Sequence, residues 1–278
     1  MNCSLREIDL GPRGGILVPA SPRTNQSFVE SFPQPPDESI LAWRYIDLPR
    51  LIDMLAHKRL CLSRLDQFAD KLEGSVPRNH YDELPQDSWV ISSAGSIRAS
   101  DRERLAELQR MRIYGTFASC WRLDNNESEL AWRACSGGKG AVAIALPYSL
   151  LARTVNWYNT FIGCVRYIDY STDTFPDFEW LSHAFMHKRL EYKSEQEARI
   201  IYHPEGWAGR DGRRKVGPED TDPVVLVPWE AEQLIERIVI SPGVSTLFSS
   251  AVKDVVSAFA PKLLDRLRSS ALTCGPAY

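Results

Sequence analysis

The sequence predicts an α+β fold with a mixed, mainly antiparallel central sheet and peripheral helices. Three observations lead to this prediction: short apolar or alternating segments recur along the chain, capped helical segments lie between them, and no internal repeat is present. The chain has 278 residues, of which 44% are hydrophobic and 25% are charged, as in ordinary globular proteins. That length is sufficient for one large domain or two small ones.

A proline-rich segment precedes the predicted domain. Residues 11–39 contain six prolines, with Gly, Ser and Asn between them, a composition typical of an extended arm. We therefore expect residues 1–39 to form an N-terminal arm and residues 40–278 to form a single α+β domain.

The first half of the domain contains clear helix starts. Asp47 is a good N-cap and Pro49 is tolerated in a first helical turn, while Ser100 and Glu103 form a capping box. The expected elements are strands at 42–45, 60–63 and 114–121, a helix from Leu48, a polar loop at 66–77 and a helix at 100–111.

The second half alternates strands, helices and glycine-rich turns. Asn125 or Asn126 is expected to cap a helix that Gly137 and Gly138 end. The other expected elements are strands at 140–146, 161–170, 195–202, 224–227 and 237–241, helices at 177–189 and 231–235, a charged loop at 204–222 and a mainly helical tail at 245–272.

Charge and cysteine usage exclude several functional classes. Lys and Arg number 33 against 36 Asp and Glu, so the net charge is −3, which excludes a strongly basic nucleic-acid footprint for the whole chain and leaves a local basic patch open. The six cysteines form no C-x-x-C pair, and no zinc-ligand spacing occurs, so we expect no metal site. Charges near the N-terminus interrupt any signal-peptide core, and the uncharged stretches are too short to span a bilayer. We expect a cytoplasmic protein with no membrane partner.

Two glutamates and an arginine form the first candidate site. In a strand, Glu195, Glu197 and Arg199 share one face. Carboxylates this close raise each other's proton affinity unless a cation lies nearby, and Arg199 is placed to supply that charge. On the pattern alone, a solvated strand face with an internal ion pair is the favoured interpretation.

Three further segments carry side chains of chemical interest. Arg44, between Trp43 and Tyr45, can bind phosphate or carboxylate, or it can stack structurally on an aromatic ring. Ser119 lacks the surroundings of a nucleophile, so we interpret it as a hydrogen-bonding residue. Trp132 can pack in the core or line a pocket, and the glycine run after it fits a helix end better than a phosphate loop.

These segments, in this order, resemble an uncharacterised bacterial family, the domain of unknown function 2971. The resemblance covers about residues 40–260. Its matching motifs are Trp43-Arg44-Tyr45, Phe117-Ala118-Ser119, Leu130-Ala131-Trp132 with Lys139-Gly140, and Lys188 with Tyr192 and Glu195-Gln196-Glu197-Ala198-Arg199. The segment 66–70 departs from the family pattern because it lacks the loop proline.

The same order of residues is more distantly similar to the ADP-ribosyltransferase superfamily. That resemblance implies NAD as substrate, Arg44 on its phosphate or ribose, Ser119 at the nicotinamide pocket and Glu197 as the catalytic carboxylate. Glu195 would orient or deprotonate the acceptor, whose identity stays open among protein, nucleic acid, small molecule and water. A fixed carboxylate would stabilise the positive charge that develops on the ribose.

The candidate site set therefore has two parts. Glu197 and Glu195 are the candidate catalytic residues, and the candidate cofactor-binding residues are Arg44, Tyr45, Ser119 and Trp132. The resulting hypothesis is an NAD-dependent, ADP-ribosyltransferase-like enzyme in a bacterial defence or toxin setting.

Two alternatives stay open. Asp177 followed by Glu195 and Glu197 loosely resembles a magnesium-dependent nuclease site, although Arg199 stands where that site has lysine. A non-catalytic binding or sensing module is the other alternative, because the aromatic residues can line an interaction groove as well as a core.

Overall fold

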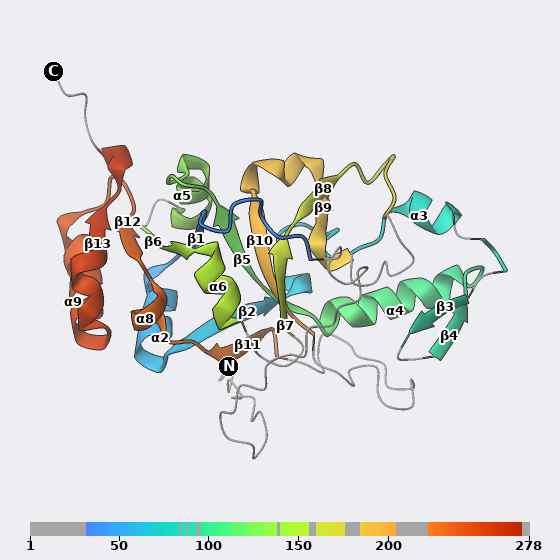
Figure 1. Ribbon diagram of the computed structural model, residues 1–278, viewed down its shortest axis with the longest axis horizontal. Helices are drawn as coiled ribbons and strands as arrows, with labels where there is room; N and C mark the ends of the chain where they lie inside the picture. Colours follow the sequence, from blue (N-terminus) through green and yellow to red (C-terminus); the bar gives the residue numbers. More distant parts are fainter. Residues whose placement is uncertain are drawn as a thin grey trace, which may run out of the picture.

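The structure has the predicted α+β architecture, with a nine-stranded, mainly antiparallel sheet at its centre (Figure 1). It is a computed structural model that describes residues 32–83, 85–87, 89–92, 95–137, 140–155, 160–175, 184–203 and 222–273. The main strand order is β11-β2-β5-β1-β6-β12-β13, and β10 and β7 continue from β5. Among the large-sheet pairs whose register is described, only β12 with β13 is parallel.

The strands of the large sheet are β1 (Leu41–Ile46), β2 (Arg59–Arg64), β5 (Phe117–Leu123), β6 (Val142–Pro147), β7 (Thr160–Cys164), β10 (Glu197–Tyr202), β11 (Val224–Pro228), β12 (Arg237–Ile240) and β13 (Leu267–Ser269). Two small sheets pair β3 (Trp89–Ser92) with β4 (Gly95–Arg98) and β8 (Arg166–Ile168) with β9 (His187–Arg189). The described α-helices are α2 (Leu48–His57), α3 (Arg78–Glu83), α4 (Arg102–Tyr114), α5 (Glu129–Ser136), α6 (Tyr148–Thr154), α8 (Ala231–Leu234) and α9 (Thr246–Phe259). The 3₁₀ segments are 65–67, 184–186, 190–195, 261–266 and 271–273.

The sheet forks at β5. Residues 117–122 of β5 pair with β10, whereas the pairing of β5 with β1 covers only Arg122 and Leu123, and its pairing with β2 covers only Phe117 and Ala118. Between these two short pairings, residues 119–121 have no register partner in either β1 or β2. The fork leaves a space between β1 and β2 that a side chain can enter.

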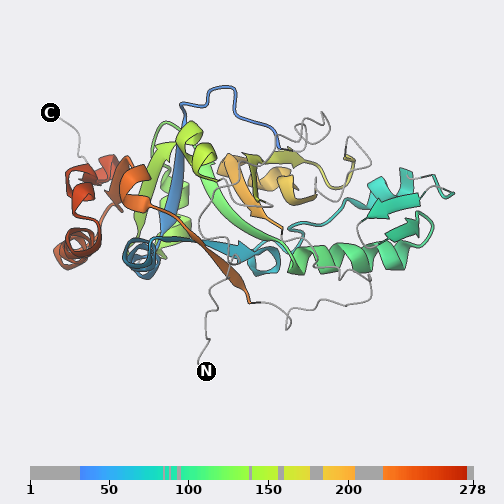
Figure 2. The same ribbon diagram turned by 60° about the horizontal axis from the view of Figure 1, so that its bottom comes forward.

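The two faces of the sheet carry different cores. The face covered by α2, α8 and α9, here called the α2 face, holds the largest core, which includes Leu51 of α2 and Ile200 of β10. The opposite face, here called the far face, holds two smaller cores, one with Ile201 and one with Trp43. Ile200 and Ile201 are neighbours in the chain, so their separation follows from the alternation of side chains along a strand. In Figure 2, α2 and α9 lie next to each other at the end of the molecule that holds β12 and β13.

Two predicted helix starts were one to three residues early. The N-cap of α4 is Asp101, whose Oδ1 accepts a hydrogen bond from the Arg104 amide at 3.1 Å, and not Ser100. The N-cap of α5 is Ser128, which accepts from the Ala131 amide, and not Asn125 or Asn126. In both segments several consecutive residues are competent caps, so composition alone did not select among them.

The predicted helix at 177–189 is wrong over its described part. Residues 184–186 form a 3₁₀ turn and 187–189 form the parallel strand β9, while 176–183 lie outside the described residues. The predicted strand at 195–202 begins only at Glu197, because Gln196 adopts a left-handed conformation with φ 45°. The tail is mainly helical as predicted, with the short strand β13 between its helical segments.

The packed structure begins before Ile40. The Phe32 ring stacks on Phe161 of β7 with centroids 5.0 Å apart, and the Cys164 amide donates to the Pro33 carbonyl at 2.6 Å. Gly163 permits this approach, since a Cβ there would lie 2.8 Å from the Phe32 carbonyl carbon. The end of the predicted arm is therefore part of the domain, while residues 1–31 lie outside the described residues.

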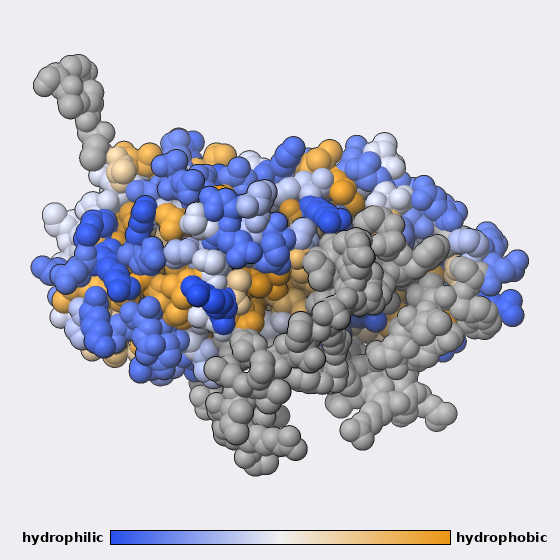
Figure 3. All heavy atoms as spheres, viewed as in Figure 1, coloured by the Kyte–Doolittle hydropathy of each residue, from blue (hydrophilic) through white to orange (hydrophobic). Residues whose placement is uncertain are grey.

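Exposed apolar side chains are found among hydrophilic ones. In the view of Figure 3, the half of the molecule nearer α9 shows apolar surface interrupted by polar residues. Leu247 of α9 and Leu130 of α5 are the most exposed of the large hydrophobic residues described, at 79% and 64%. None of the described helices combines the length and the apolar character that a bilayer crossing requires.

Candidate functional site

The residues predicted to form one site lie on two faces of the sheet. In the strand registers, Arg44 is opposite Ile144 and Ser119 is opposite Ile200, and both isoleucines belong to the core of the α2 face. Glu197 is three residues before Ile200, so its side chain leaves β10 toward the far face. The structure therefore brings Arg44 and Ser119 together and separates both from Glu197.

The Arg44 side chain enters the fork of the sheet. Its guanidinium makes a close hydrogen bond to Ser119 Oγ and donates to the Cys61 carbonyl at 2.9 Å. It also lies over the Trp121 ring, 5.7 Å from the centroid. Trp121 Nε1 donates to the same Ser119 Oγ at 3.0 Å. Ser119 thus positions Arg44, as expected for a hydrogen-bonding residue and not for a nucleophile.

The Arg44 guanidinium is held without a counter-charge. Among the described residues, no carboxylate forms an ion pair with Arg44, although most other interior arginines have one. Burial lowers the pKa of Arg44, and the nearby charge of Arg50 lowers it further. A partly buried cation with only neutral partners retains the capacity to bind an anion.

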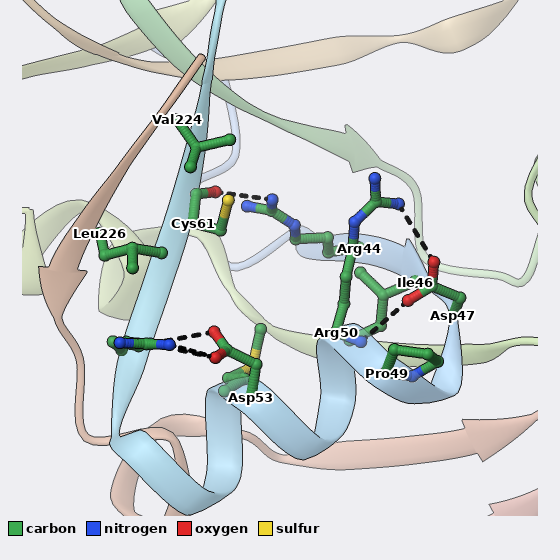
Figure 4. Close-up of a pocket in the computed structure, with 11 residues that line it drawn as sticks. Arg44, Ile46, Asp47, Pro49, Arg50, Asp53, Cys61, Val224 and Leu226 are labelled. Atoms are coloured by element: carbon green, nitrogen blue, oxygen red, sulfur yellow. Dashed lines mark hydrogen bonds and ion pairs between the residues drawn. The ribbon is translucent and has the colours of Figure 1, made fainter. Parts of the chain in front are cut away.

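A pocket of about 230 Å³ adjoins this guanidinium (Figure 4). Its lining comes from β1, α2, β2 and β11 and comprises Arg44, Ile46, Asp47, Pro49, Arg50, Asp53, Met54, Arg59, Cys61, Val224 and Leu226. Arg59 is already committed, since its Nε lies 3.1 Å from both oxygens of Asp53. Arg50 contacts Asp47 only at 3.6 Å, across two largely exposed side chains. Arg44 and Arg50 are therefore the two guanidinium groups of the pocket that have no close ion pair with a carboxylate of the described residues.

The far face contains a buried charge cluster around Arg199. Arg199 Nε donates to Glu197 Oε1 at 2.8 Å, and Nη2 donates to Glu197 Oε2 at 3.1 Å. Its Nη1 donates to Glu73 Oε1 at 2.6 Å and to the Phe185 carbonyl at 2.7 Å. All three charged side chains are at most 4% exposed. This bidentate geometry is typical of a structural ion pair that fixes two segments far apart in the chain.

Lys188 joins Glu195 to this cluster. Its Nζ lies 2.5 Å from Glu195 Oε2 and 3.4 Å from Glu197 Oε2, and 4.6 Å from the centroid of the Tyr192 ring. The Glu195 side chain is 44% exposed, against 4% for Glu197. Glu197 and Arg199 share a face of β10 as expected, but Glu195 lies outside the strand, and a lysine connects the two carboxylates instead.

The electrostatics of the cluster keep Glu197 ionised. Burial alone would raise the pKa of Glu197, but the charge and hydrogen bonds of Arg199 and the charge of Lys188 outweigh it and lower the pKa to about 2. The same attraction raises the pKa of Lys188 and of Arg199 against the effect of burial. A carboxylate held this firmly by cations is a poor proton acceptor and has little freedom to meet a substrate.

Tyr45 and Trp132 pack together on the far face, away from the Arg44 pocket. Their rings meet edge to face with centroids 4.8 Å apart, and both belong to the core around Trp43. The Tyr45 hydroxyl accepts from the Ser128 amide at 2.8 Å, and Trp132 Nε1 donates to Glu127 at 3.0 Å. Both side chains stabilise the start of α5 against β1, so neither lies beside Arg44 as a cofactor-binding residue.

The described residues do not assemble a metal centre. Within the ranges given above, no three His, Cys, Asp or Glu side chains gather as metal ligands. Asp177, the first carboxylate of the nuclease alternative, lies outside the described residues. Its other two carboxylates, Glu195 and Glu197, already share the Lys188 ammonium group.

Several participants were not identified from the sequence. Arg50 and Cys61 complete the pocket, and Glu73 completes the buried cluster. Arg50 follows the Asp47 cap by three residues, a spacing that indicates only a helix start, and Glu73 belongs to a segment with no periodic pattern. Comparison of the chain with protein-family models, curated proteins and solved structures finds no match.

Proposed function

We propose that this protein binds a nucleotide through an anionic phosphate group placed against Arg44, with NAD as the first candidate ligand. The supporting observation is the Arg44 guanidinium at the sheet fork, which is oriented by Ser119 and the Cys61 carbonyl and has no carboxylate partner among the described residues. Guanidinium groups bind phosphate through paired, charge-assisted hydrogen bonds. The resemblance to ADP-ribosyltransferases, in which this arginine holds NAD, selects the ligand to test first.

Cleavage of NAD would need a carboxylate beside the ribose in addition to Arg44. Glu197 does not support that role, because it leaves the opposite face of the sheet and is bonded to Arg199 and Lys188. The carboxylates of the pocket itself are Asp47 and Asp53. The proposal therefore rests on binding, and a protein that binds NAD without cleaving it would be a sensing module.

Calorimetric titration with NAD and with ADP-ribose tests this proposal. We expect wild-type protein to bind at least one of them, and Arg44→Gln to bind at least about tenfold more weakly, since a charge-assisted hydrogen bond contributes about 1.5–3 kcal/mol. Glu195→Gln is the matched control, because it also removes a charge that contacts a buried cation but on the far face. Its affinity should equal that of wild type.

Nicotinamide release, measured in the same samples, separates binding from transfer. Release that Glu195→Gln retains and Arg44→Gln loses would support an NAD-cleaving enzyme built around the pocket. Folded wild-type protein that binds neither ligand would overturn the proposal.

A further inference from the structure

The pocket contains a second guanidinium that the proposed function does not use. Arg50 lies in the first turn of α2 and lines the same pocket as Arg44. Its side chain is 62% exposed, and its contact with Asp47 is long, at 3.6 Å. Surface ion pairs of this kind contribute about 0–1 kcal/mol, so Arg50 can turn to a ligand at little cost. Figure 4 shows Arg44 from β1 and Arg50 from α2 flanking the same space.

The pocket holds two carboxylates, Asp53 and Asp47, beside its three guanidinium groups. Arg59 and Asp53 neutralise each other through their bidentate contact. The remaining wall is apolar and includes Ile46, Val224 and Leu226. A ligand entering this pocket therefore meets the Arg44 and Arg50 guanidinium groups at one end, with the Asp47 carboxylate beside Arg50 as the N-cap of α2, and apolar side chains elsewhere.

We propose that Arg44 and Arg50 together bind a phosphate monoester, and that Arg50 makes the pocket prefer a terminal phosphate to the bridging phosphates of a dinucleotide. This inference rests on the proposed function, because it assigns a second residue and a ligand class to the same site. A phosphate monoester carries about 1.5–2 negative charges at neutral pH, whereas each bridging phosphate of a dinucleotide carries one. Two guanidinium groups match the higher charge and the exposed oxygens of the monoester.

The size of the pocket supports the same ligand class. Pockets that enclose drug-sized ligands have volumes of about 300–1,000 Å³, and this one has about 230 Å³. It holds a phosphate with a small adjoining group, such as a pentose, and leaves any larger part of a ligand outside. A terminal phosphate can enter first, whereas a bridging phosphate is flanked by bulk on both sides.

Cys61 provides a direct reporter of occupancy. Cys61 is partly exposed and lines the pocket. Its backbone carbonyl accepts a hydrogen bond from Arg44. Burial raises the pKa of the Cys61 thiol, so we would measure its alkylation by iodoacetamide at an alkaline pH at which the free protein reacts at a measurable rate, and resolve each cysteine by peptide mass spectrometry. The probes are AMP, a phosphate monoester, and NAD, a dinucleotide. Cys164 of β7, which does not line the pocket, is the internal control.

We expect AMP to slow the alkylation of Cys61 at a concentration at least about tenfold lower than NAD requires. In Arg50→Gln that advantage should disappear, and in Arg50→Lys part of it should return. Arg50 is exposed, so both variants should fold as wild type does.

Equal protection by NAD and AMP, or an AMP advantage that persists in Arg50→Gln, would overturn this inference and leave the proposed function standing. Protection by neither ligand, with calorimetry also showing no binding, would overturn both.

Discussion

At the residue scale, two interior arginines of the same sheet have opposite environments. Arg199 is bound by two carboxylates, Glu197 and Glu73, and burial does not prevent its pKa from being raised. Arg44 has only a hydroxyl, a carbonyl and a ring as partners among the described residues, and burial lowers its pKa. A buried ion pair is costly to break, because removing one partner leaves the other charge buried and unpaired, whereas a buried charge without a partner already costs stability and is typical of a binding site.

This difference predicts opposite effects of one substitution at the two sites. Arg199→Met should lower the free energy of unfolding by about 3–5 kcal/mol, because it leaves buried carboxylates with too little counter-charge. Arg44→Met should leave it unchanged or raise it by up to about 1 kcal/mol, because it removes a desolvated charge with no ion-pair partner. Urea denaturation measures both values. A loss of several kcal/mol in Arg44→Met would assign Arg44 a structural role instead.

Stability should fall with decreasing pH in two separate ranges. Burial, with the charge of Arg112, lowers the pKa of His203 to about 4 from an ordinary value of 6.5, so its neutral form is favoured in the folded state. The pKa of Glu197 is lowered to about 2 from 4.5, so its charged form is favoured. The contribution of His203 is complete above about pH 6.5 and is lost toward pH 4. The contribution of Glu197 is complete above about pH 4.5 and is lost toward pH 2, and the amount lost is about 3 kcal/mol.

Urea denaturation at several pH values tests these ranges. In His203→Gln, which can keep the hydrogen bond to Thr116, the decline should begin only near pH 4.5, whereas in wild type it begins near pH 6.5. Identical profiles for the two proteins would show that His203 does not titrate as described.

The sequence predicted the nature of some interactions but not their burial. It placed a cation, Arg199, beside Glu197, and the structure confirms that pair. It did not predict that Glu73 forms a second buried ion pair with Arg199, because Glu73 and Arg199 are 126 positions apart in the chain. Nor did it predict the left-handed Gln196, which removes Glu195 from the strand; only Gly, Asn and Asp commonly signal such a conformation.

At the element scale, β5 is the strand that joins the parts of the large sheet, because it pairs with β10, β1 and β2. Its aromatic and small residues were correctly predicted to form a strand, although the observed bounds are Phe117–Leu123. Its fork, which creates the space for Arg44, depends on two short pairings with β1 and β2. Such pairings join residues far apart in sequence, and no local pattern encodes them.

Gly163 of β7 should be intolerant of a side chain. In Gly163→Ala the new Cβ would meet the backbone of Phe32 at 2.8–2.9 Å, so the segment 32–36 would have to move from the edge of β7. We expect a loss of about 1–3 kcal/mol in unfolding free energy and faster hydrogen exchange at the Cys164 amide, which is bonded to Pro33.

A double-mutant cycle tests the cause of that loss. If the clash is with the segment 32–36, Gly163→Ala should cost little in a chain that lacks residues 1–36. An undiminished cost in the shortened chain would show that the substitution acts on β7 itself.

At the scale of the whole molecule, the separation of Arg44 from Glu197 decides the functional interpretation. The sequence predicted the fold class and most strands, yet the assignment of each residue to a face depends on strand register. A shift of one residue moves a side chain to the other face of a sheet. The order of motifs along the chain therefore could not show whether the arginine, serine and glutamate share one face.

The increase in unfolding free energy on ligand binding tests most directly whether Arg44 and Glu197 belong to different sites. The free energy of unfolding would be determined with and without saturating ADP-ribose for wild type, Arg44→Gln and Glu197→Gln. A ligand at about 100 times its dissociation constant adds about 2.7 kcal/mol. We predict that Glu197→Gln loses about 3–5 kcal/mol of stability but keeps this increment, and that Arg44→Gln keeps its stability but loses the increment. Loss of the increment in Glu197→Gln, with its stability intact, would contradict the account and place both residues in one site.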